Sequence, residues 1–217
     1  MISTNLELNI NTLKQYTIKM AQRCDQSLEN ASNCILNKDL DQAKKIINDD
    51  EEINVLREYI IDRSIELMAL KQPMAKDLRY IYALGNIALE LERIGDYTAN
   101  IAEEILNIDE EKYIKSVVDI PKMIEECKEM LLSSIEALKN DDEELAYNTA
   151  LRDDTVDIIY KKIYKDCSQI MNEDLSKVNQ GIRLLFIARY LERIGDHITN
   201  ICEKIIYAIK GEMIEIG

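Results

Sequence analysis

Turn-forming residues are scarce in this sequence of 217 residues, which contains six Gly and two Pro. A β-sandwich or β-barrel needs many tight turns, and Gly and Pro are the residues that punctuate them. Their scarcity argues against both architectures and favours long helices. Apolar residues make up 47% of the chain and charged residues 31%, as in an ordinary globular protein rather than a disordered one.

Long apolar runs are also absent, since no segment approaches the ~18–20 apolar residues of a membrane span. The first residues lack the basic start and apolar block of a secretory signal. The five cysteines are odd in number and form no C-x-x-C pair, so neither a disulfide framework nor a thiolate zinc site is encoded. We therefore expect a cytoplasmic protein with no direct membrane insertion.

Basic residues are outnumbered, with 27 Lys and Arg against 41 Asp and Glu, which gives a net charge of −14. Such a chain repels the phosphate backbone of nucleic acids and anionic membrane surfaces, so we expect no nucleic-acid partner. The excess acid by itself is equally well explained by solubility. Cations and basic faces of partner proteins remain open as ligands.

The chain contains an internal repeat with an offset of 100 residues. Residues 87–105 (IALELERIGDYTANIAEEI) match residues 187–205 (IARYLERIGDHITNICEKI) at 12 of 19 positions. Random alignment would give roughly one or two matches at this composition. The repeat predicts two like domains, at 1–109 and 110–217.

Each copy is expected to form three long helices. The predicted segments are 5–36, 40–70 and 74–107 in the first copy, and 119–139, 142–172 and 177–209 in the second. A 30-residue helix is about 45 Å long. The predicted fold class is therefore all-α, with two tandem antiparallel three-helix bundles related by the internal repeat.

The third helix of each copy combines an apolar seam with a stripe of acids. Apolar residues recur at steps of three and four, which is typical of a bundle core. The acids lie within a sector of roughly 40°, about 160° from that seam, and we expect them to face outward. They are Glu92, Asp96 and Glu103 in the first copy, and Glu192, Asp196 and Glu203 in the second.

A strip of small residues separates the acids from the seam and includes Gly95 and Gly195. Each glycine costs about 1 kcal/mol relative to Ala in the middle of a helix, so a steric reason is expected. Close approach of the second helix of the same bundle is one explanation. A ligand or backbone beside the glycine is the other, and the sequence leaves both open.

The Glu-x-x-x-Asp spacing places two carboxylates one helical turn apart, where they could bridge a hard cation that prefers oxygen ligands. The second helix offers matching pairs, Asp50 with Asn54 and Asp153 with Asp157. Such pairs also arise by chance in an acidic chain, so a solvated acidic face is the alternative. Their placement in both copies strengthens the metal interpretation and leaves the two explanations about equal.

The motif LERIGD at 91–96 and 191–196, each time followed by an Asn and a Glu on the same helix, resembles the PhoU family of phosphate-transport accessory regulators. The segment QPMAKDLR at 72–79 adds to this resemblance, which spans essentially the whole chain. Members of this family are cytoplasmic, often dimeric, all-helical proteins that restrain phosphate uptake and phosphate-starvation signalling. The resemblance implies a homodimer whose partners are the ATPase subunit of the Pst phosphate transporter and a phosphate-regulon sensor histidine kinase.

The resemblance also implies surface sites for multinuclear clusters of divalent or trivalent metal ions, whether iron, manganese, magnesium, zinc or calcium. The implied ligands are Asp50, Glu92, Asp96, Asp153, Asp157, Glu192 and Asp196. Possible second-layer groups are Asn54, Glu103, Arg93, Arg193, His197 and Glu203. Asn54 replaces an acid, and Tyr97 stands where the family commonly has a histidine, so the first site is expected to bind less metal or a different one.

Two other polar residue types admit simpler interpretations. Arg93 and Arg193 lie beside the acids, and we favour ion pairing with them over contact with an anionic ligand. His197 is the only histidine and lies on the flank of its helix away from the small residues. We interpret it as a boundary group rather than a metal ligand.

The leading functional hypothesis is a metal-binding adaptor and not an enzyme. The sequence has no nucleophile elbow and no Gly-rich phosphate loop. A carboxylate-bridged di-iron oxidase would need Glu-x-x-His on two inward-facing helices, a pattern that is absent here. A structural helical module without metal is the remaining alternative.

Overall fold

The computed structural model describes residues 2–108, 113–114 and 119–216, and it is built from helices. Its elements are α1 (Ile2–Asn37), α2 (Leu40–Lys71), α3 (Ala75–Leu106), α4 (Asp119–Asn140), α5 (Glu143–Ala150), α6 (Asp153–Glu173), the 3-10 helix η2 (Leu175–Lys177) and α7 (Val178–Lys210). These described ranges contain no strand, and the predicted all-α class is confirmed. The predicted division at 109/110 lies outside the described residues and stays a prediction.

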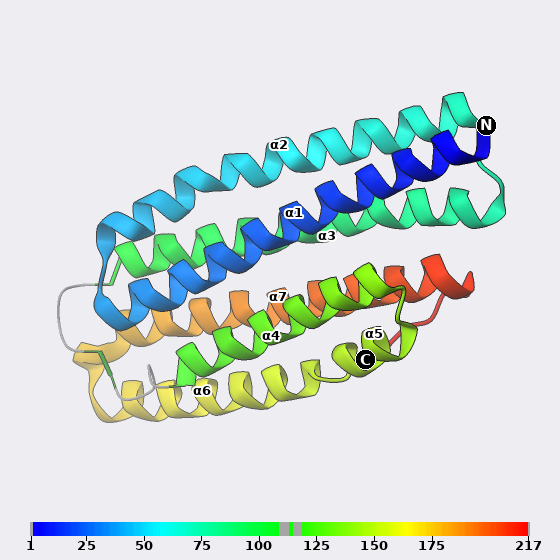
Figure 1. The fold of residues 1–217 in the computed structure, drawn as a ribbon. Helices are drawn as coiled ribbons and strands as arrows, with labels where there is room; N and C mark the ends of the chain where they lie inside the picture. The colour runs from blue at the N-terminus through cyan, green and yellow to red at the C-terminus, as the bar shows by residue number, and fades with distance from the viewer. Residues whose placement is uncertain (1, 109–112, 115–118, 217) are drawn as a thin grey trace.

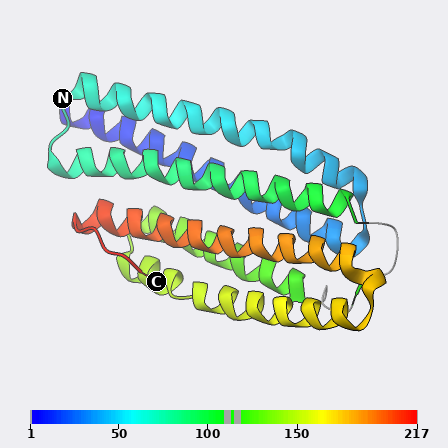
Figure 2. The ribbon, with the colours of Figure 1, turned by 180° about the vertical axis from the view of Figure 1, so that it is seen from behind.

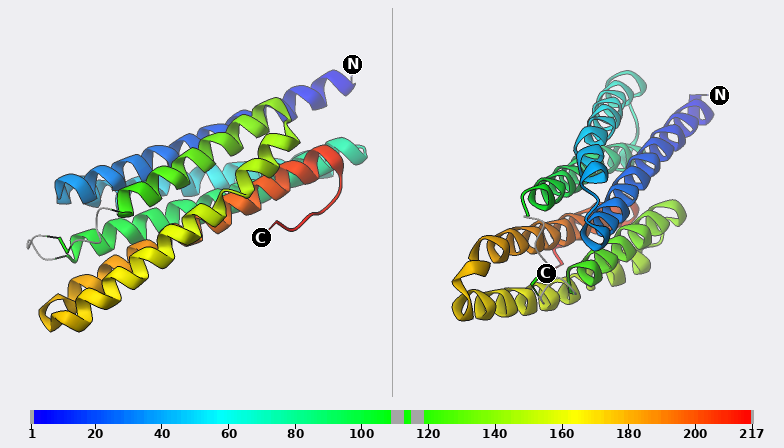
Figure 3. Two further views of the ribbon diagram at one scale, coloured as in Figure 1. Left: turned by 90° about the horizontal axis from the view of Figure 1, so that it is seen from below. Right: turned by 90° about the vertical axis from the view of Figure 1, so that its left-hand side faces the viewer.

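The helices form two bundles that lie side by side, one made of α1 to α3 and the other of α4 to α7 (Figure 1). The joint between them is made by α3 against α7, and α1 also contacts α4. Seen from behind, α2, α3, α7 and α6 form one face of the molecule, with α1 and α4 beneath (Figure 2). The two bundles are elongated in the same direction (Figure 3).

The apolar seam of each third helix is buried, as predicted. Its residues are Ile87, Leu91, Ile94, Thr98, Ile101 and Ile105 in α3, and Ile187, Leu191, Ile194, Ile198, Ile201 and Ile205 in α7, and none is more than 2% exposed. Thr98 is the one polar member, and its hydroxyl donates to the carbonyl oxygen of Ile94 at 2.7 Å. The five cysteines are buried as well.

The turn between the first and second helix is built alike in both copies. Asp39 accepts a hydrogen bond from the backbone N–H of Gln42 at 3.0 Å, and Asp142 accepts one from Leu145 at 2.9 Å. Such N-caps satisfy donors that the first helical turn leaves unpaired. The residue before each cap has a positive φ, 54° at Lys38 and 51° at Asp141.

The second helix of the second copy departs from the prediction of one helix over 142–172. The helix is interrupted at Leu151 and Arg152, between α5 and α6. Here the N–H of Arg152 donates to the carbonyl oxygen of Thr149, and the N–H of Thr155 donates to the carbonyl oxygen of Arg152. These bonds span three residues and tighten the turn. The Arg152 guanidinium reaches down to Glu126 and Glu129 of α4, which holds the turn in place.

Within the part of the chain that the structure describes, no helix is both long and apolar enough to cross a membrane.

Candidate functional site

The predicted acids gather in two groups, each between the second and third helix of one copy. The first acidic site consists of Asp50 from α2 with Glu92 and Asp96 from α3, which lie close enough to act on the Asp50 charge. The second acidic site consists of Asp153 and Asp157 from α6 with Glu192 and Asp196 from α7. All seven predicted ligands thus fall into two groups related by the repeat.

The acids are less exposed than an outward-facing stripe would be. The side chains of Asp96 and Asp196 are 37% and 39% exposed, in accord with the expectation. Those of Glu92 and Glu192 are only 18% and 14% exposed, so they lie outside the core, as expected, but are largely covered. The position of the acids around their own helix axis takes no account of the neighbouring second helix, whose side chains cover one side of the acidic stripe.

Gly95 and Gly195 make room for a carboxylate of the second helix. A Cβ atom at Gly95 would lie 2.7 Å from Oδ1 of Asp50, and one at Gly195 would lie 2.3 Å from Oδ1 of Asp153. The Gly95 Cβ would also meet Cδ1 of Ile53 at 3.0 Å, so close helix packing contributes too. The glycines therefore leave room for side chains of α2 and α6, among them the two aspartates.

Burial and neighbouring acids oppose the ionisation of Asp50 and Asp153. Burial raises the pKa of Asp153 to about 7, and the charges of Asp196, Asp157 and Glu192 add to the effect. Burial and the charge of Asp96 raise the pKa of Asp50 to about 6, against a lowering hydrogen bond from Asn54. Each ionised site carries charge repulsion that a bound cation would relieve.

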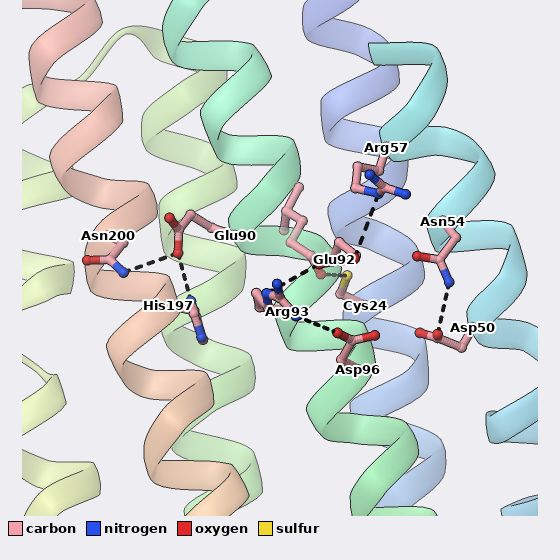
Figure 4. A network of polar contacts seen from close by, with 11 residues as sticks. Cys24, Asp50, Asn54, Arg57, Glu90, Glu92, Arg93, Asp96, His197 and Asn200 are labelled. Atoms are coloured by element: carbon pink, nitrogen blue, oxygen red, sulfur yellow. Dashed lines mark hydrogen bonds and ion pairs between the residues drawn. The ribbon is translucent and has the colours of Figure 1, made fainter. Parts of the chain in front are cut away.

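Basic and amide side chains offset part of this repulsion. Arg93 donates to Asp96 at 3.1 Å, and Arg193 donates to Asp196 at 2.8 Å, so the expected ion pairs are present. Asn54 donates from Nδ2 to Oδ2 of Asp50 at 3.2 Å (Figure 4). Arg57 of α2 lies with Nε 3.8 Å from Oε1 of Glu92 in the same view.

Some buried oxygens of the second site lack a hydrogen-bond partner, namely Oδ1 of Asp153, Oε2 of Glu192 and Oγ1 of the neighbouring Thr199. Buried polar atoms are normally bonded, so these exceptions need an explanation. A donor set of carboxylate oxygens suits hard cations such as Mg²⁺, Mn²⁺, Ca²⁺ or iron. Still, no group of three or more His, Cys, Asp or Glu among the described residues is arranged to hold an ion, so the carboxylates would have to move to coordinate one.

Two further acids lie outside the two groups. Glu103 is exposed on α3. Glu203 accepts a hydrogen bond from the backbone N–H of Ile216 at 2.9 Å. The C-terminal segment after α7 therefore turns back and lies against the second copy.

His197 lies at the joint between the copies rather than among the acids. Its Nδ1 is 2.7 Å from Oε2 of Glu90, which also accepts from Asn200 at 3.1 Å (Figure 4). The ring of Tyr97 lies beside it at 5.6 Å between centroids. Sequence reasoning missed Glu90 and Asn200, although the comparison of the copies contains a signal, since Glu90 corresponds to Tyr190 at the offset of 100.

A cavity of about 990 Å³ adjoins the second acidic site. Its walls include Glu192 and Asp196, the aromatic rings of Tyr82 and Tyr97 from α3, and the segment Met213–Ile216. This volume suits a ligand far larger than a single ion. The cavity therefore connects the acids of one copy with a helix of the other.

These features define an all-helical protein made of two tandem three-helix repeats, each with a cluster of acids between two of its helices. The chain belongs to the PhoU family, whose PhoU domain model matches residues 17–105 and 120–205. It is 35% identical to the phosphate-specific transport system accessory protein PhoU homolog of Clostridium acetobutylicum over 212 residues, which cover 97% of each chain. The PhoU homolog of Aquifex aeolicus is 35% identical over 202 residues, 93% of this chain and 91% of that relative.

Solved structures agree with this assignment. The phosphate transport system regulatory protein PhoU from Streptococcus pneumoniae superimposes with a TM-score of 0.92 at 27% identity, covering 97% of this chain and 100% of that one. PhoU from Pseudomonas aeruginosa gives a TM-score of 0.91 at 26% identity, covering 95% and 99% of the two chains.

Proposed function

We propose that this protein is an accessory regulator of phosphate transport that binds metal ions at its two acidic sites and acts by docking, without catalysing a reaction. Its proposed partners in the cytoplasm are the ATPase subunit of the Pst phosphate transporter and the sensor histidine kinase of the phosphate regulon. Family membership over nearly the whole chain carries the regulatory part of the proposal. The working form is proposed to be a homodimer, which light scattering of the purified protein tests.

The metal part of the proposal rests on the second acidic site. Asp153 and Glu192 each keep a buried oxygen without a hydrogen-bond partner, and Gly195 leaves the space that the Asp153 carboxylate occupies. Asp157 and Asp196 complete an all-oxygen donor set. A bound cation would neutralise these acids and link α6 to α7.

The first site has fewer charges, because Asn54 stands where Asp157 stands in the second copy. Its amide donates to Asp50 and so takes up an oxygen that a metal would need. We expect weaker metal binding at the first site. The change Asn54→Asp should strengthen it.

The metal experiment compares isosteric variants purified without chelator. Elemental analysis should find metal in the wild type and much less in the double variant Glu192→Gln with Asp196→Asn, while circular dichroism shows that both are folded. Titration with Mn²⁺ should show tighter binding by Asn54→Asp than by the wild type. Equal metal content in wild type and double variant would remove the second site as the metal centre.

The regulatory experiment is independent of the metal. Deletion of the gene should leave phosphate-starvation genes expressed when phosphate is plentiful, and the wild-type gene should restore repression. Pull-down with the purified transporter ATPase and the kinase tests the two proposed partners directly. Normal repression in the deletion strain, with no second copy of the gene to explain it, would refute the regulatory role.

A metal-free docking protein is the second candidate function. It is favoured by the lack, in the described ranges, of three acids, histidines or cysteines already arranged around an ion. Metal absent from every sample, together with loss of repression on deletion, would select it.

A further inference from the structure

Exposed apolar side chains form a band on the two helices that join the copies. Its outer members are Leu78, Tyr82 and Leu89 on α3 and Ile182 and Phe186 on α7, with exposures of 41%, 45%, 44%, 41% and 46%. At 100° per residue, the three on α3 fall within a sector of roughly 40°, about 160° from the buried seam and directly beside the sector of Glu92 and Asp96. They therefore point away from the core, on the face made by α2, α3, α7 and α6.

Contacts between aromatic rings connect the apolar residues of α3 with those of α7. Tyr97 stacks on Tyr190 with ring centroids 5.8 Å apart, and Tyr190 lies 6.4 Å from Phe186. Because Tyr97 contacts Tyr190 while Glu90 contacts His197, the two helices run antiparallel. Ile182 and Phe186 thus lie beside the C-terminal half of α3, and the band continues for about 40 Å at 1.5 Å per residue.

Negative charge borders the band on both sides. The helices follow the order α2, α3, α7, α6 across this face (Figure 2), so one acidic site lies on either side of the joint. Tyr82 and Tyr97 of the band line the same cavity as Glu192 and Asp196. Basic side chains offset part of this charge, since Arg93 and Arg193 are each paired with an aspartate. Arg189 is paired with Glu192, and Lys204 lines the same cavity.

We propose that this band, defined by Leu78, Tyr82, Leu89, Tyr97, Ile182, Phe186 and Tyr190, is the docking surface for one amphipathic helix of a partner protein. The partner helix has an apolar stripe with Lys or Arg on both flanks. Its stripe covers the exposed rings and leucines, and its cations meet the two acidic sites, as in other helix-in-groove complexes. The inference rests on the docking role proposed above and concerns the metal-free protein, because a bound cation would neutralise the acids that the partner's Lys and Arg meet. The binding experiments below are therefore made with chelator.

The charge pattern selects a basic partner over a second copy of the chain. Two copies facing each other through this band would bring four acidic sites together, and like-charge contact across an interface is costly. An anionic membrane surface is repelled for the same reason. In the proposed complex the apolar band forms the centre of the interface, and the two acidic sites form its polar rim.

The test uses a fluorescein-labelled synthetic helix of Leu and Lys, about seven turns long, with a leucine stripe and lysine flanks. Fluorescence anisotropy at physiological salt should show saturable binding to the wild-type chain. The double variant Leu89→Ser with Phe186→Ser should bind about tenfold more weakly, because two apolar contacts at the centre are lost. The matched control Leu36→Ser with Leu70→Ser, which changes residues 62% and 69% exposed elsewhere, should bind within about twofold of the wild type.

Two further probes separate shape from charge. A helix with Ser in place of the Leu stripe keeps the lysines and should bind at least about tenfold more weakly, and a Leu/Glu helix should not bind. Equal binding of the Leu and Ser probes, or equal affinity of the band and control variants, would overturn the proposal. The band variant is also tested for restoring repression in the deletion strain, where it should fail and the control variant should succeed.

These outcomes keep the two proposals apart. If deletion leaves repression intact while the band variant still loses the probe, the regulatory role fails and the docking surface stands. If the wild-type gene restores repression and the band variant does so equally, the docking surface fails and the regulatory role stands.

Discussion

A single missing methyl group at Gly195 determines whether the Asp153 carboxylate can lie in its groove. The change Gly195→Ala places a Cβ 2.3 Å from Oδ1 of Asp153 and 3.3 Å from Cγ1 of Val156, so the carboxylate is displaced. Overpacking of this kind outweighs the gain in helix propensity, and we expect a net loss of about 1 kcal/mol in unfolding free energy. Urea unfolding measures the loss, and Mn²⁺ titration should show weaker binding.

The control for this prediction is Gly85→Ala on the other third helix. Its Cβ would lie 3.5 Å from Oγ of Ser64, an ordinary contact, so the same substitution should stabilise the protein by about 0.5–1 kcal/mol. Equal stabilisation by both alanines would show that Gly195 is not needed for close approach.

The raised pKa of Asp153 makes the stability of the metal-free protein depend on pH. The native carboxyl keeps its proton to about pH 7, whereas the unfolded one loses it near its ordinary value of 3.8, so stability is lost as pH rises from about 4 to 7. Asp153→Asn removes this loss. Because the carboxyl is partly exposed and solvent screens its charge, the variant should exceed the wild type by about 1–2 kcal/mol at pH 8.

Urea unfolding with chelator at pH 4.5 and pH 8 measures this effect. The advantage of Asp153→Asn over the wild type should be smaller at pH 4.5. An equal difference at the two pH values would contradict the raised pKa of Asp153.

Residue spacing was sufficient to place the acids of each third helix on a common stripe beside a strip of small residues. It could not give the exposure of Glu192, because the covering atoms belong to other helices. Nor could it give the contact between His197 and Glu90, which joins residues 107 positions apart in the sequence. The sequence of one helix gives the angles between its side chains, whereas the burial and contacts of those side chains depend on the neighbouring helices.

The turn after α2 concentrates strain at one residue. Gln72 has φ 47° and ψ 56°, a left-handed conformation that costs a side-chain-bearing residue about 1–2 kcal/mol and glycine little. Gln72→Gly should therefore raise the unfolding free energy by about 0.5–1 kcal/mol. Thermal unfolding of Gln72→Ala serves as the control, since alanine retains the strain, and a gain shared by both variants would refute this explanation.

Element positions were largely predictable, and the exception has a tertiary cause. Five of the six predicted helices correspond to single α-helices with ends shifted by a few residues. The segment 142–172 was expected to be continuous, as α2 is in the first copy. The interruption between α5 and α6 is stabilised by hydrogen bonds from Arg152 to Glu126 and Glu129, which lie more than twenty positions earlier in the chain.

The two copies are held together partly by a polar contact in their joint. Glu90 is half-buried, and hydrogen bonds from His197 and Asn200 overcome the effect of burial and lower its pKa. Glu90→Ala leaves both donors without their acceptor and should cost about 1–2 kcal/mol of unfolding free energy. The exposed residue Glu103 on the same helix provides the control, and urea unfolding of Glu103→Ala should stay within about 0.5 kcal/mol of the wild type.

The packing of one copy against the other was beyond sequence reasoning. The repeat predicts two like bundles, but it carries no information about which helices meet. The joint of α3 with α7 includes the contact between Tyr97 and Tyr190. Neither tyrosine is repeated in the other copy, where His197 and Glu90 occupy the corresponding positions. A search for identical residues in the two copies therefore does not detect these contact positions.

The return of the chain after α7 affects how the protein should be prepared. Met213–Ile216 lines the cavity beside the second acidic site, so a polyhistidine tag appended after the last residue would bring imidazoles to the carboxylates under study. Metal retained by such a preparation would report on the tag as well as on the native side chains. A removable tag on the amino terminus precedes α1, which contributes no residue to the cavity walls, and so makes elemental analysis easier to interpret.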